Sequence, residues 1–305
     1  MESASRSQTN GPKRVLVVFN PIAGRTRPGH FEGVVSELQQ LGCDVTVRET
    51  TRRGDAETFA RLSDPSNVDA IVAAGGDGTI DEVLNGLMGP EGPQNTIPLG
   101  IIPLGTANVL AAEIGLPSTP KDIAAVIATG TRLHCHPGQA NGHFFLMMAG
   151  VGFDAHVVDI THPRLKKMFG KGAYAYATVC QLLRPPPGPY KVTIEGVAYA
   201  AASVVVGKGH FYAGTFVCTP DARLDSPLFQ ICLFRDGGAW ATLKYLFGFL
   251  TAKLPQMANV TLMQTDQLRI EGPPGDPVQG DGDIFTSLPL DIQISHLTFE
   301  LLVPA

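Results

Sequence analysis

The sequence has no apolar run as long as the roughly 18 residues that a membrane-spanning helix needs. It has no surplus of basic residues either, because 23 Lys and Arg face 28 Asp and Glu, and the net charge of −5 argues against nucleic acid as a partner. The five cysteines lie far apart without a CxxC pair, so we expect reduced core thiols rather than disulfides or a zinc site. The first dozen residues are polar and lack the apolar segment of a signal peptide, and we expect a disordered tail there. These absences favour a cytoplasmic protein.

The chain of 305 residues is long enough for two domains, and its first part alternates between two patterns. Between residues 13 and 132, apolar runs rich in β-branched residues alternate with segments of helical periodicity. The expected strands span 14–19, 43–50, 68–75 and 97–104, and the expected helices span 31–42, 55–63, 79–88, 107–116 and 120–130. This alternation indicates an α/β domain with a parallel sheet covered on both faces, in which ligands bind outside the carboxyl ends of the strands.

The pattern changes after residue 132. One helical segment at 163–184 is followed by a proline-rich breaker and then by short strands with few helices between them. The expected strands lie at 190–196, about 200–207, 229–234, 258–264, 267–272 and 290–295, with a further helix at about 238–253. We therefore expect an antiparallel β-sandwich over residues 133–305, and a site in the cleft between the two domains.

The stretch AAGGDGTIDEVLNGL (73–87) places three glycines around Asp77, directly before an amphipathic helix. Thr79 and Glu82 form the pattern of a capping box, which predicts that the helix starts at Thr79. Glycines at 75, 76 and 78 would then let backbone N–H groups and the positive helix end meet a phosphate. Asp77 would repel that phosphate unless a cation or a transferable proton lay between them. The alternative is a tight turn in which glycine serves geometry alone.

Two further loops follow predicted strands at the same sheet edge. NPIAGR (20–25) follows the first strand, and PLGTAN (103–108) follows the fourth. Arg25 can bind phosphate through two parallel hydrogen bonds, or it can simply be solvated. Thr106 can donate its hydroxyl to a ligand, or it can cap the following helix. Because three such loops would converge on one ligand, the sequence favours a nucleotide.

NPIAGR, TTRRGDA (50–56), GGDGTIDEVLNGL (75–87) and PLGTANVLA (103–111), in this order and spacing, resemble the catalytic domain of the diacylglycerol kinase family. The resemblance continues with FFLMMAGVGFDAHV (144–157), YAG (212–214), PDARLD (220–225) and GDGD (280–283). It implies a phosphofructokinase/NAD-kinase-like parallel-sheet domain followed by an antiparallel β-sandwich domain. It also implies an enzyme that transfers the γ-phosphate of ATP to a lipid hydroxyl, diacylglycerol being the first candidate acceptor.

The resemblance also implies roles for individual residues. In place of the family's general-base glutamate in a DGE motif, this chain has Asp283, whose side chain is one methylene shorter. Asp77 is a second candidate, either as base or as magnesium contact, and the two remain open. GDGD is equally compatible with an ordinary acidic turn. The residues implied in nucleotide binding are Asn20, Gly24, Arg25, Thr50, Gly75, Gly76, Asp77, Gly78, Thr79, Gly105, Thr106 and Asn108.

Magnesium is implied as a cofactor, both with ATP and at a structural site that related bacterial kinases build from an LDDGLLD motif. Here the corresponding stretch is LDSPLFQ (224–230), which retains only the first acid. A site would have to use Asp225, the Leu228 carbonyl and Gln230, although magnesium prefers carboxylates and water in octahedral geometry.

A lipid acceptor requires contact with a bilayer, and two segments could provide it. The segment 237–255 carries apolar residues at helical spacing with lysines beside them, and it can lie in a membrane interface or pack on the sandwich. The basic stretch 164–172 could favour anionic lipid. We thus expect a cytoplasmic protein with transient contact at the inner face of the membrane. A homodimer, an NAD kinase-like enzyme and a catalytically inactive nucleotide-binding regulator remain alternatives.

Overall fold

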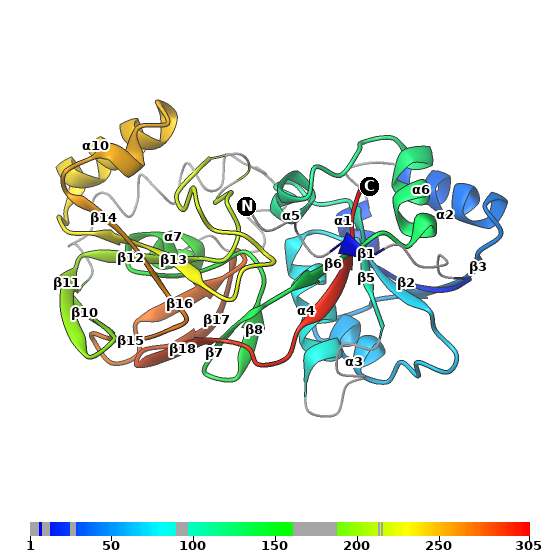
Figure 1. Ribbon diagram of the computed structural model, residues 1–305, viewed down its shortest axis with the longest axis horizontal. Coiled ribbons are helices and arrows are strands. Elements are labelled where there is room, and N and C mark those ends of the chain that lie inside the picture. The colour runs from blue at the N-terminus through cyan, green and yellow to red at the C-terminus, as the bar shows by residue number, and fades with distance from the viewer. Residues whose placement is uncertain are drawn as a thin grey trace. The chain divides into compact units, whose positions relative to one another are not determined.

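The computed structural model describes residues 6–7, 13–24, 29–89, 97–160, 188–212, 214 and 216–305. The chain divides into two compact units (Figure 1). Unit 1 comprises Met1–Pro137 together with Ser295–Ala305, and unit 2 comprises Gly138–Ile294. The sequence placed every residue after 132 in the second domain, whereas the last strand, β19 (Phe299–Leu302), lies in the sheet of unit 1.

Unit 1 is built on a seven-stranded sheet with the order β1-β6-β19-β5-β4-β2-β3. Strands β3, β2, β4 and β5 are parallel, β19 runs parallel to β5, and β6 and β1 continue the sheet in antiparallel fashion. The strands are β1 (Arg6–Ser7), β2 (Arg14–Phe19), β3 (Asp44–Glu49), β4 (Ala70–Gly75), β5 (Leu99–Pro103) and β6 (Arg132–Cys135). The predicted parallel sheet is confirmed.

Helices cover both faces of this sheet (Figure 1). Helices α2 (His30–Gln40) and α6 (Pro120–Thr129) pack on one face, where Val34, Leu38 and Ile127 join a core with alternate residues of β2 and β4. Helices α3 (Asp55–Arg61) and α4 (Asp77–Met88) pack against each other on the other side. Two short helices, α1 (Pro21–Gly24) and α5 (Val109–Glu113), follow β2 and β5. Because both faces are covered, every residue of β4 and β5 is buried, which explains their unbroken apolar sequences.

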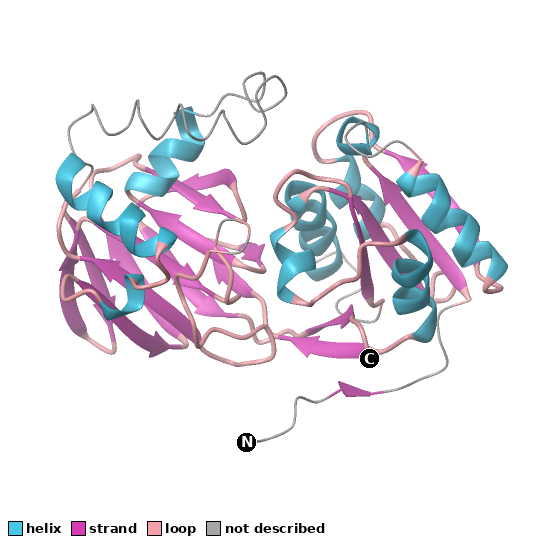
Figure 2. Ribbon diagram, turned by 90° about the horizontal axis from the view of Figure 1, so that it is seen from above, coloured by secondary structure: helices cyan, strands magenta, loops and turns pink. Residues whose placement is uncertain are grey.

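Unit 2 consists of two six-stranded antiparallel sheets, ordered β11-β10-β15-β18-β7-β8 and β14-β13-β12-β9-β16-β17. Figure 2 shows the contrast between the strand-rich unit 2 and the alternating helices and strands of unit 1. The first sheet contains β7 (Gly138–Ala140), β8 (His143–Phe145), β10 (Tyr190–Ile194), β11 (Val197–Ala201), β15 (Gln267–Glu271) and β18 (Leu290–Ile294). The second contains β9 (Met148–Val151), β12 (Ser203–Gly207), β13 (Phe229–Phe234), β14 (Val260–Thr265), β16 (Pro277–Gly280) and β17 (Asp283–Ser287).

Side chains from both sheets fill one core, so the predicted sandwich is confirmed. Within it, the single strand predicted near 200–207 is two strands, β11 and β12, which belong to different sheets. Helix α7 (Phe153–Ile160) contacts β9, β16 and β17, and helix α10 (Ala239–Leu250), followed by the short η1 (Leu254–Gln256), packs through Tyr245 on Phe234 of β13. The helix predicted at 163–184 and the basic stretch within it lie outside the described residues. Among the helices of the described part of the chain, none has the length and apolar character to cross a membrane.

Candidate nucleotide site and acidic turn

The loops that leave β2, β4 and β5 lie together at the carboxyl edge of the unit 1 sheet. Backbone hydrogen bonds continue the sheet beyond the strand ends: the N–H of Asn20 donates to the carbonyl of Ala74 (2.9 Å), and that of Leu104 to Gly75 (2.8 Å). The glycine-containing loops therefore converge, as the sequence predicted, at the edge where α/β proteins bind ligands.

Gly76 and Gly105 let two of these loops approach backbone to backbone. A Cβ on Gly105 would lie 2.6 Å from the Cα of Gly76 and 2.9 Å from Oδ1 of Asn108, which real Cβ atoms do not allow. A Cβ on Gly76 would lie 3.4 Å from the Cα of Gly105, an ordinary contact. The two loops therefore meet through bare backbone and expose no side chains at that point, as a phosphate cradle requires.

Helix α4 begins at Asp77, two residues before the start that the capping box predicted. Gly76 occupies the N-cap with extended backbone (φ −92°, ψ −176°) and offers no side chain, so no side-chain cap is present. The carboxylate of Glu82 accepts a hydrogen bond from the N–H of Ala56 in α3 (3.2 Å) instead of closing the capping box. The N–H groups of the first turn of α4 therefore lack a side-chain cap, which leaves the positive helix end available to an anion.

Asn20 and Thr79 join the first two loops to each other. The side-chain amide of Asn20 donates to the buried hydroxyl of Thr79 (3.1 Å), while its Oδ1 accepts from the N–H of Ile22 in α1 (3.1 Å). Gly75 is needed beside them, because a Cβ there would collide with the side chain of Thr79. These residues hold the shape of the site by bonding to one another.

Asp77 points to the helix that follows the neighbouring strand. Its Oδ1 accepts a hydrogen bond from the N–H of Val109 at the start of α5 (2.9 Å). Burial raises the pKa of this carboxyl, and the backbone N–H groups of Val109, Leu110 and Asn108 oppose that rise. Asp77 thus ties the α4 loop to the α5 loop.

The remaining predicted nucleotide residues that the structure describes lie around this edge. Thr106 is exposed and does not cap α5, because the N-cap is Asn108, whose backbone is left-handed (φ 49°) and whose amide donates to the carbonyl of Gly105 (2.9 Å). Thr50 lies at the end of β3, where its N–H donates to Phe19 (2.8 Å). Gly24 ends α1 and Gly78 lies in the first turn of α4, while Arg25 lies outside the described residues.

In the acidic turn GDGD of unit 2, the first aspartate is bound by three backbone N–H groups. Asp281, whose backbone is left-handed (φ 49°), accepts hydrogen bonds from the N–H groups of Leu146 (2.7 Å), Met147 (2.9 Å) and Met148 (2.9 Å). Asp283 follows as the first residue of β17, paired with Gly280, and is half-buried. The turn therefore fixes the backbone from which the Asp283 side chain extends.

Comparison with known proteins shows to which family this chain belongs. The diacylglycerol kinase catalytic domain matches residues 14–140, and the YegS C-terminal NAD kinase beta sandwich-like domain matches residues 147–303. A diacylglycerol kinase of Bacillus subtilis (strain 168) is 30% identical over 230 residues, which cover 73% of this chain and 74% of that protein. The chain belongs to the diacylglycerol kinase family. It is accordingly a kinase.

Two further members of the diacylglycerol kinase family match nearly the whole chain. A diacylglycerol kinase of Mycobacterium tuberculosis (strain ATCC 25618 / H37Rv) is 26% identical, with 99% of each chain covered. The crystal structure of a diacylglycerol kinase from Bacillus anthracis str. Sterne superimposes with a TM-score of 0.79 at 25% identity, covering 97% of this chain and 99% of that one. The similarity thus extends over both units of this kinase.

The structure also reveals an acidic network in unit 2 of this kinase to which the sequence assigned no role. Oδ2 of Asp154, on α7, accepts hydrogen bonds from the hydroxyl of Tyr212 (3.1 Å) and the amide of Gln279 (3.1 Å). The side-chain Oε1 of Gln279 accepts a hydrogen bond from the N–H of Gly282 (3.1 Å), so the network reaches the turn before Asp283. Burial raises the pKa of Asp154. The only sequence signal was an acid directly after the G-V-G-F stretch.

The three residues suggested as structural magnesium ligands do not fit a metal ion in this family member. Both carboxylate oxygens of Asp225 accept hydrogen bonds from the guanidinium of Arg223 (3.0 and 2.8 Å), which lowers the pKa of Asp225. The side-chain oxygen of Gln230 accepts from the N–H of Asp221 (2.7 Å), and Leu228 lies in an exposed turn. Within the described ranges, no group of three or more His, Cys, Asp or Glu side chains could hold a metal.

A lysine supplies positive charge to this segment instead. Lys208 is fully buried, and its ammonium donates to the carbonyl oxygens of Arg223 and Leu224, the latter at 3.1 Å. Its charge also acts to lower the pKa of Asp225, after the larger effect of Arg223. The carbonyls that precede Asp225 are thus already bound by a cation that belongs to the chain.

Proposed function

We propose that this kinase transfers the γ-phosphate of ATP to the hydroxyl of a lipid, with a diacylglycerol-like alcohol as acceptor. The observation that carries the proposal is the uncapped N-terminus of α4 beside the bare backbone of Gly105, at the carboxyl edge of a parallel sheet. This arrangement suits the phosphates of a nucleotide because backbone donors and the helix dipole both favour negative charge there.

ATP would reach the site as its magnesium complex, and the ion would neutralise charge on the phosphates during transfer. Gly75, Gly76, Gly78 and Gly105 would allow the phosphates to approach the backbone. Thr106, which is exposed on the loop after β5, would add a hydroxyl donor. The polypeptide would thereby position the nucleotide while magnesium is delivered with the substrate.

We propose Asp283 as the general base that accepts the proton of the lipid hydroxyl. A base must be able to take up a proton, and a carboxylate that already accepts several backbone N–H bonds is a poor proton acceptor. Asp281 has three such bonds, and Asp77 is directed at the start of α5. Asp283, at the start of β17, occupies the position of the family's general-base glutamate, and we therefore favour it over the other acids of these two turns.

The test is a transfer assay with radiolabelled ATP and diacylglycerol in mixed micelles, with the products separated by thin-layer chromatography. Asp283→Asn keeps the shape of the side chain but cannot accept a proton, so turnover should fall by roughly 100- to 10,000-fold while ATP affinity stays near wild type. Asp283→Glu, which introduces the base the family usually carries, should retain much of the activity. Asp266→Asn, on an exposed turn of the same unit, is the matched control.

Two results would contradict the proposal. Wild-type turnover by Asp283→Asn together with an inactive Asp77→Asn would move the base to Asp77. Absence of labelled product from every lipid alcohol offered, with intact ATP binding, would support a nucleotide-binding regulator instead.

We further propose a cytoplasmic protein that acts at the inner face of the membrane, since ATP is cytoplasmic and a diacylglycerol-like acceptor resides in a bilayer. Its product would be a lipid phosphomonoester of the kind that phospholipid synthesis uses.

A further inference from the structure

Helix α10 of unit 2 has the sequence AWATLKYLFGFL, which is apolar almost all round. Its inward side consists of Ala241, Tyr245 and Gly248. Tyr245 packs edge-on against Phe234 with ring centroids 4.9 Å apart, and a Cβ on Gly248 would lie 2.6 Å from the sulfur of Met257. Ala241, Tyr245 and Gly248 thus seat the helix on the sandwich, and Phe249 stacks on Tyr212, which leaves the other large apolar side chains of the helix to be accounted for.

Those larger side chains face solvent. The exposed fractions are 72% for Trp240, 67% for Phe247 and 65% for Leu250, with Leu243 and Leu246 above 40%. Trp240, Leu243, Phe247 and Leu250 follow one another at helical spacing, so they form a single stripe. Isolated exposed apolar residues are normal on a protein surface, but five on one helix of 12 residues mark an interaction surface.

The charges on this face are all positive. Helix α10 contains Lys244 and no acidic residue, and Lys253 follows three residues after its end. The ammonium of Lys244 lies 5.8 Å from the ring centroid of Trp240. Asp236, the acid nearest before the helix, accepts a hydrogen bond from the side-chain amide of Asn259 (3.1 Å).

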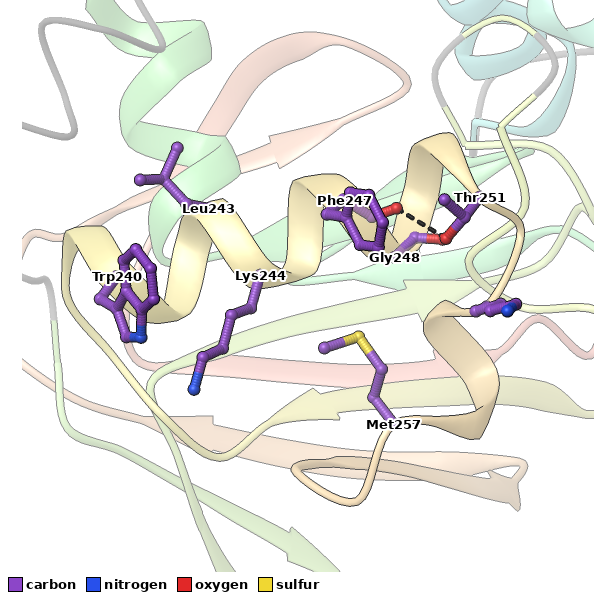
Figure 3. Close-up of a pocket in the computed structure, with 8 residues that line it drawn as sticks. Trp240, Leu243, Lys244, Phe247, Gly248, Thr251 and Met257 are labelled. Atoms are coloured by element: carbon purple, nitrogen blue, oxygen red, sulfur yellow. Dashed lines mark hydrogen bonds between the residues drawn. The ribbon is translucent and has the colours of Figure 1, made fainter.

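An open groove of about 420 Å³ runs along the helix, and Figure 3 shows its lining. Lys244 extends beside the ring of Trp240, Phe247 projects from the following turn, and Met257 reaches toward them from the segment after η1. The lining combines apolar surface with the aliphatic stems of Lys244 and Lys253, whose charged ends remain in water.

We propose that this face, defined by Trp240, Leu243, Phe247, Leu250, Lys244 and Lys253, docks on an anionic lipid bilayer. The helix lies in the plane of the interface, its apolar stripe enters the boundary between headgroups and acyl chains, and the two lysines bind anionic headgroups. The inference rests on the proposed function for its biological reason, because a lipid acceptor must be collected from a membrane.

Charge is the argument for a bilayer rather than a second copy of the chain. The whole protein carries a net charge of −5, yet this face has two lysines and no acid of its own helix. Two copies of the face would bring like charges together, whereas an anionic membrane complements them. An aromatic residue with a polar ring nitrogen at one end of the stripe also suits the interface between water and lipid.

The chain contains a single tryptophan, Trp240, so its fluorescence reports on this face alone. The full-length protein is titrated with vesicles of phosphatidylcholine mixed with phosphatidylglycerol, and in parallel with vesicles of phosphatidylcholine alone. Docking should shift the emission to shorter wavelength and allow brominated lipid to quench it, more strongly with the anionic vesicles. Emission that is indifferent to both vesicle types would overturn the proposal.

Sedimentation with the same vesicles tests individual side chains. The double variant Trp240→Ser/Phe247→Ser should bind at least about tenfold more weakly, and Lys244→Gln or Lys253→Gln about fivefold more weakly to anionic vesicles only. Val197→Ser removes an exposed apolar side chain (53% exposed) from β11 of the same unit and should bind as wild type does. Equal losses in Val197→Ser and in the double variant would contradict a role for α10.

Two further readouts separate the rival explanations. Emission that shifts with protein concentration in the absence of vesicles, together with a dimer in sedimentation equilibrium, would assign the face to a second copy and overturn the proposal. The vesicle assays need no catalysis, so failure of the kinase assay on dispersed short-chain diacylglycerol would refute the proposed function and leave the docking result standing. The double variant should keep wild-type turnover on that dispersed substrate while losing activity on vesicles.

Discussion

Replacing the buried Lys208 with methionine tests whether an internal cation holds the segment before Asp225. The change keeps the length of the side chain and removes the ammonium that donates to the carbonyls of Arg223 and Leu224. Each buried acceptor that loses its partner costs about 1–3 kcal/mol, and the apolar methionine recovers part of this by packing. We therefore expect unit 2 to lose about 3 kcal/mol of unfolding free energy, a fall of roughly 6–12 °C in its Tm for a domain of this size.

The assay is thermal unfolding of the full chain followed by circular dichroism, with and without EDTA and with added magnesium. Lys191→Met is the matched control, because Lys191 is a lysine of the same unit whose side chain is 61% exposed and pairs with Glu271 at 3.0 Å. Such a surface pair contributes about 0–1 kcal/mol, so its loss should hardly move the Tm. The wild-type Tm should not respond to EDTA. A Tm of Lys208→Met equal to that of wild type, or a wild-type Tm that falls in EDTA and recovers with magnesium, would refute the reasoning.

Three further outcomes follow from contacts elsewhere. Gly105→Ala should weaken ATP binding at least about tenfold in calorimetry, because the added Cβ would overpack against Gly76 at a cost of about 1–3 kcal/mol. Gly76→Ala should fold normally, because its Cβ would make an ordinary contact with Gly105. Hydrogen bonds from Arg14 lower the pKa of Asp69 from 3.8 to about 2. The contribution of Asp69 to the free energy of unfolding is therefore complete above pH 4 and is lost as the pH falls through 2. In urea titrations, the free energy of unfolding of Asp69→Asn should fall less steeply with acid than that of wild type. Burial raises the pKa of Asp154, so this group makes stability fall as the pH rises above 3.8, and Asp154→Asn should raise the Tm at pH 7 more than at pH 4.

The parallel sheet of unit 1 was predictable because its strands are buried on both faces. β2 and β4 read as RVLVVF and AIVAAG, and burial on both sides leaves such runs without polar alternation. The loops that follow these strands could be placed at one edge for the same reason, since parallel strands end on the same side. The edge at which these loops converge was therefore predictable from periodicity alone, before any resemblance was used.

The start of α4 was not predictable from local pattern. Thr79 and Glu82 have the spacing of a capping box, but both side chains have partners from elsewhere in unit 1. Asn20 donates to the hydroxyl of Thr79, and Glu82 accepts from the N–H of Ala56. These tertiary partners lie 59 and 26 residues away in sequence, and a local rule contains no information about them.

The antiparallel sandwich of unit 2 was predictable as a fold class, but its individual strands and their pairing were not. Short strands such as β7 and β8 have three residues each, too few for alternation to show. β19 pairs with β5 and β6 in unit 1, and only the tertiary structure reveals that a strand at the end of the chain closes the first sheet. The buried lysine that binds the carbonyls of Arg223 and Leu224 was equally hidden, because nothing around Lys208 in the sequence marks it as buried.

The two GDG turns of this chain, at 76–78 and 280–282, show why residue type alone could not assign the acids. In each turn the aspartate accepts hydrogen bonds from the backbone of a distant segment: Asp77 from the start of α5, and Asp281 from residues 146–148. In the second turn, Gly282 has a positive φ (91°), which glycine adopts without strain. Each aspartate thus organises a loop, and holding a loop is a different task from accepting a proton. In the function we propose, proton transfer falls to Asp283, which lies directly after the turn at the start of β17.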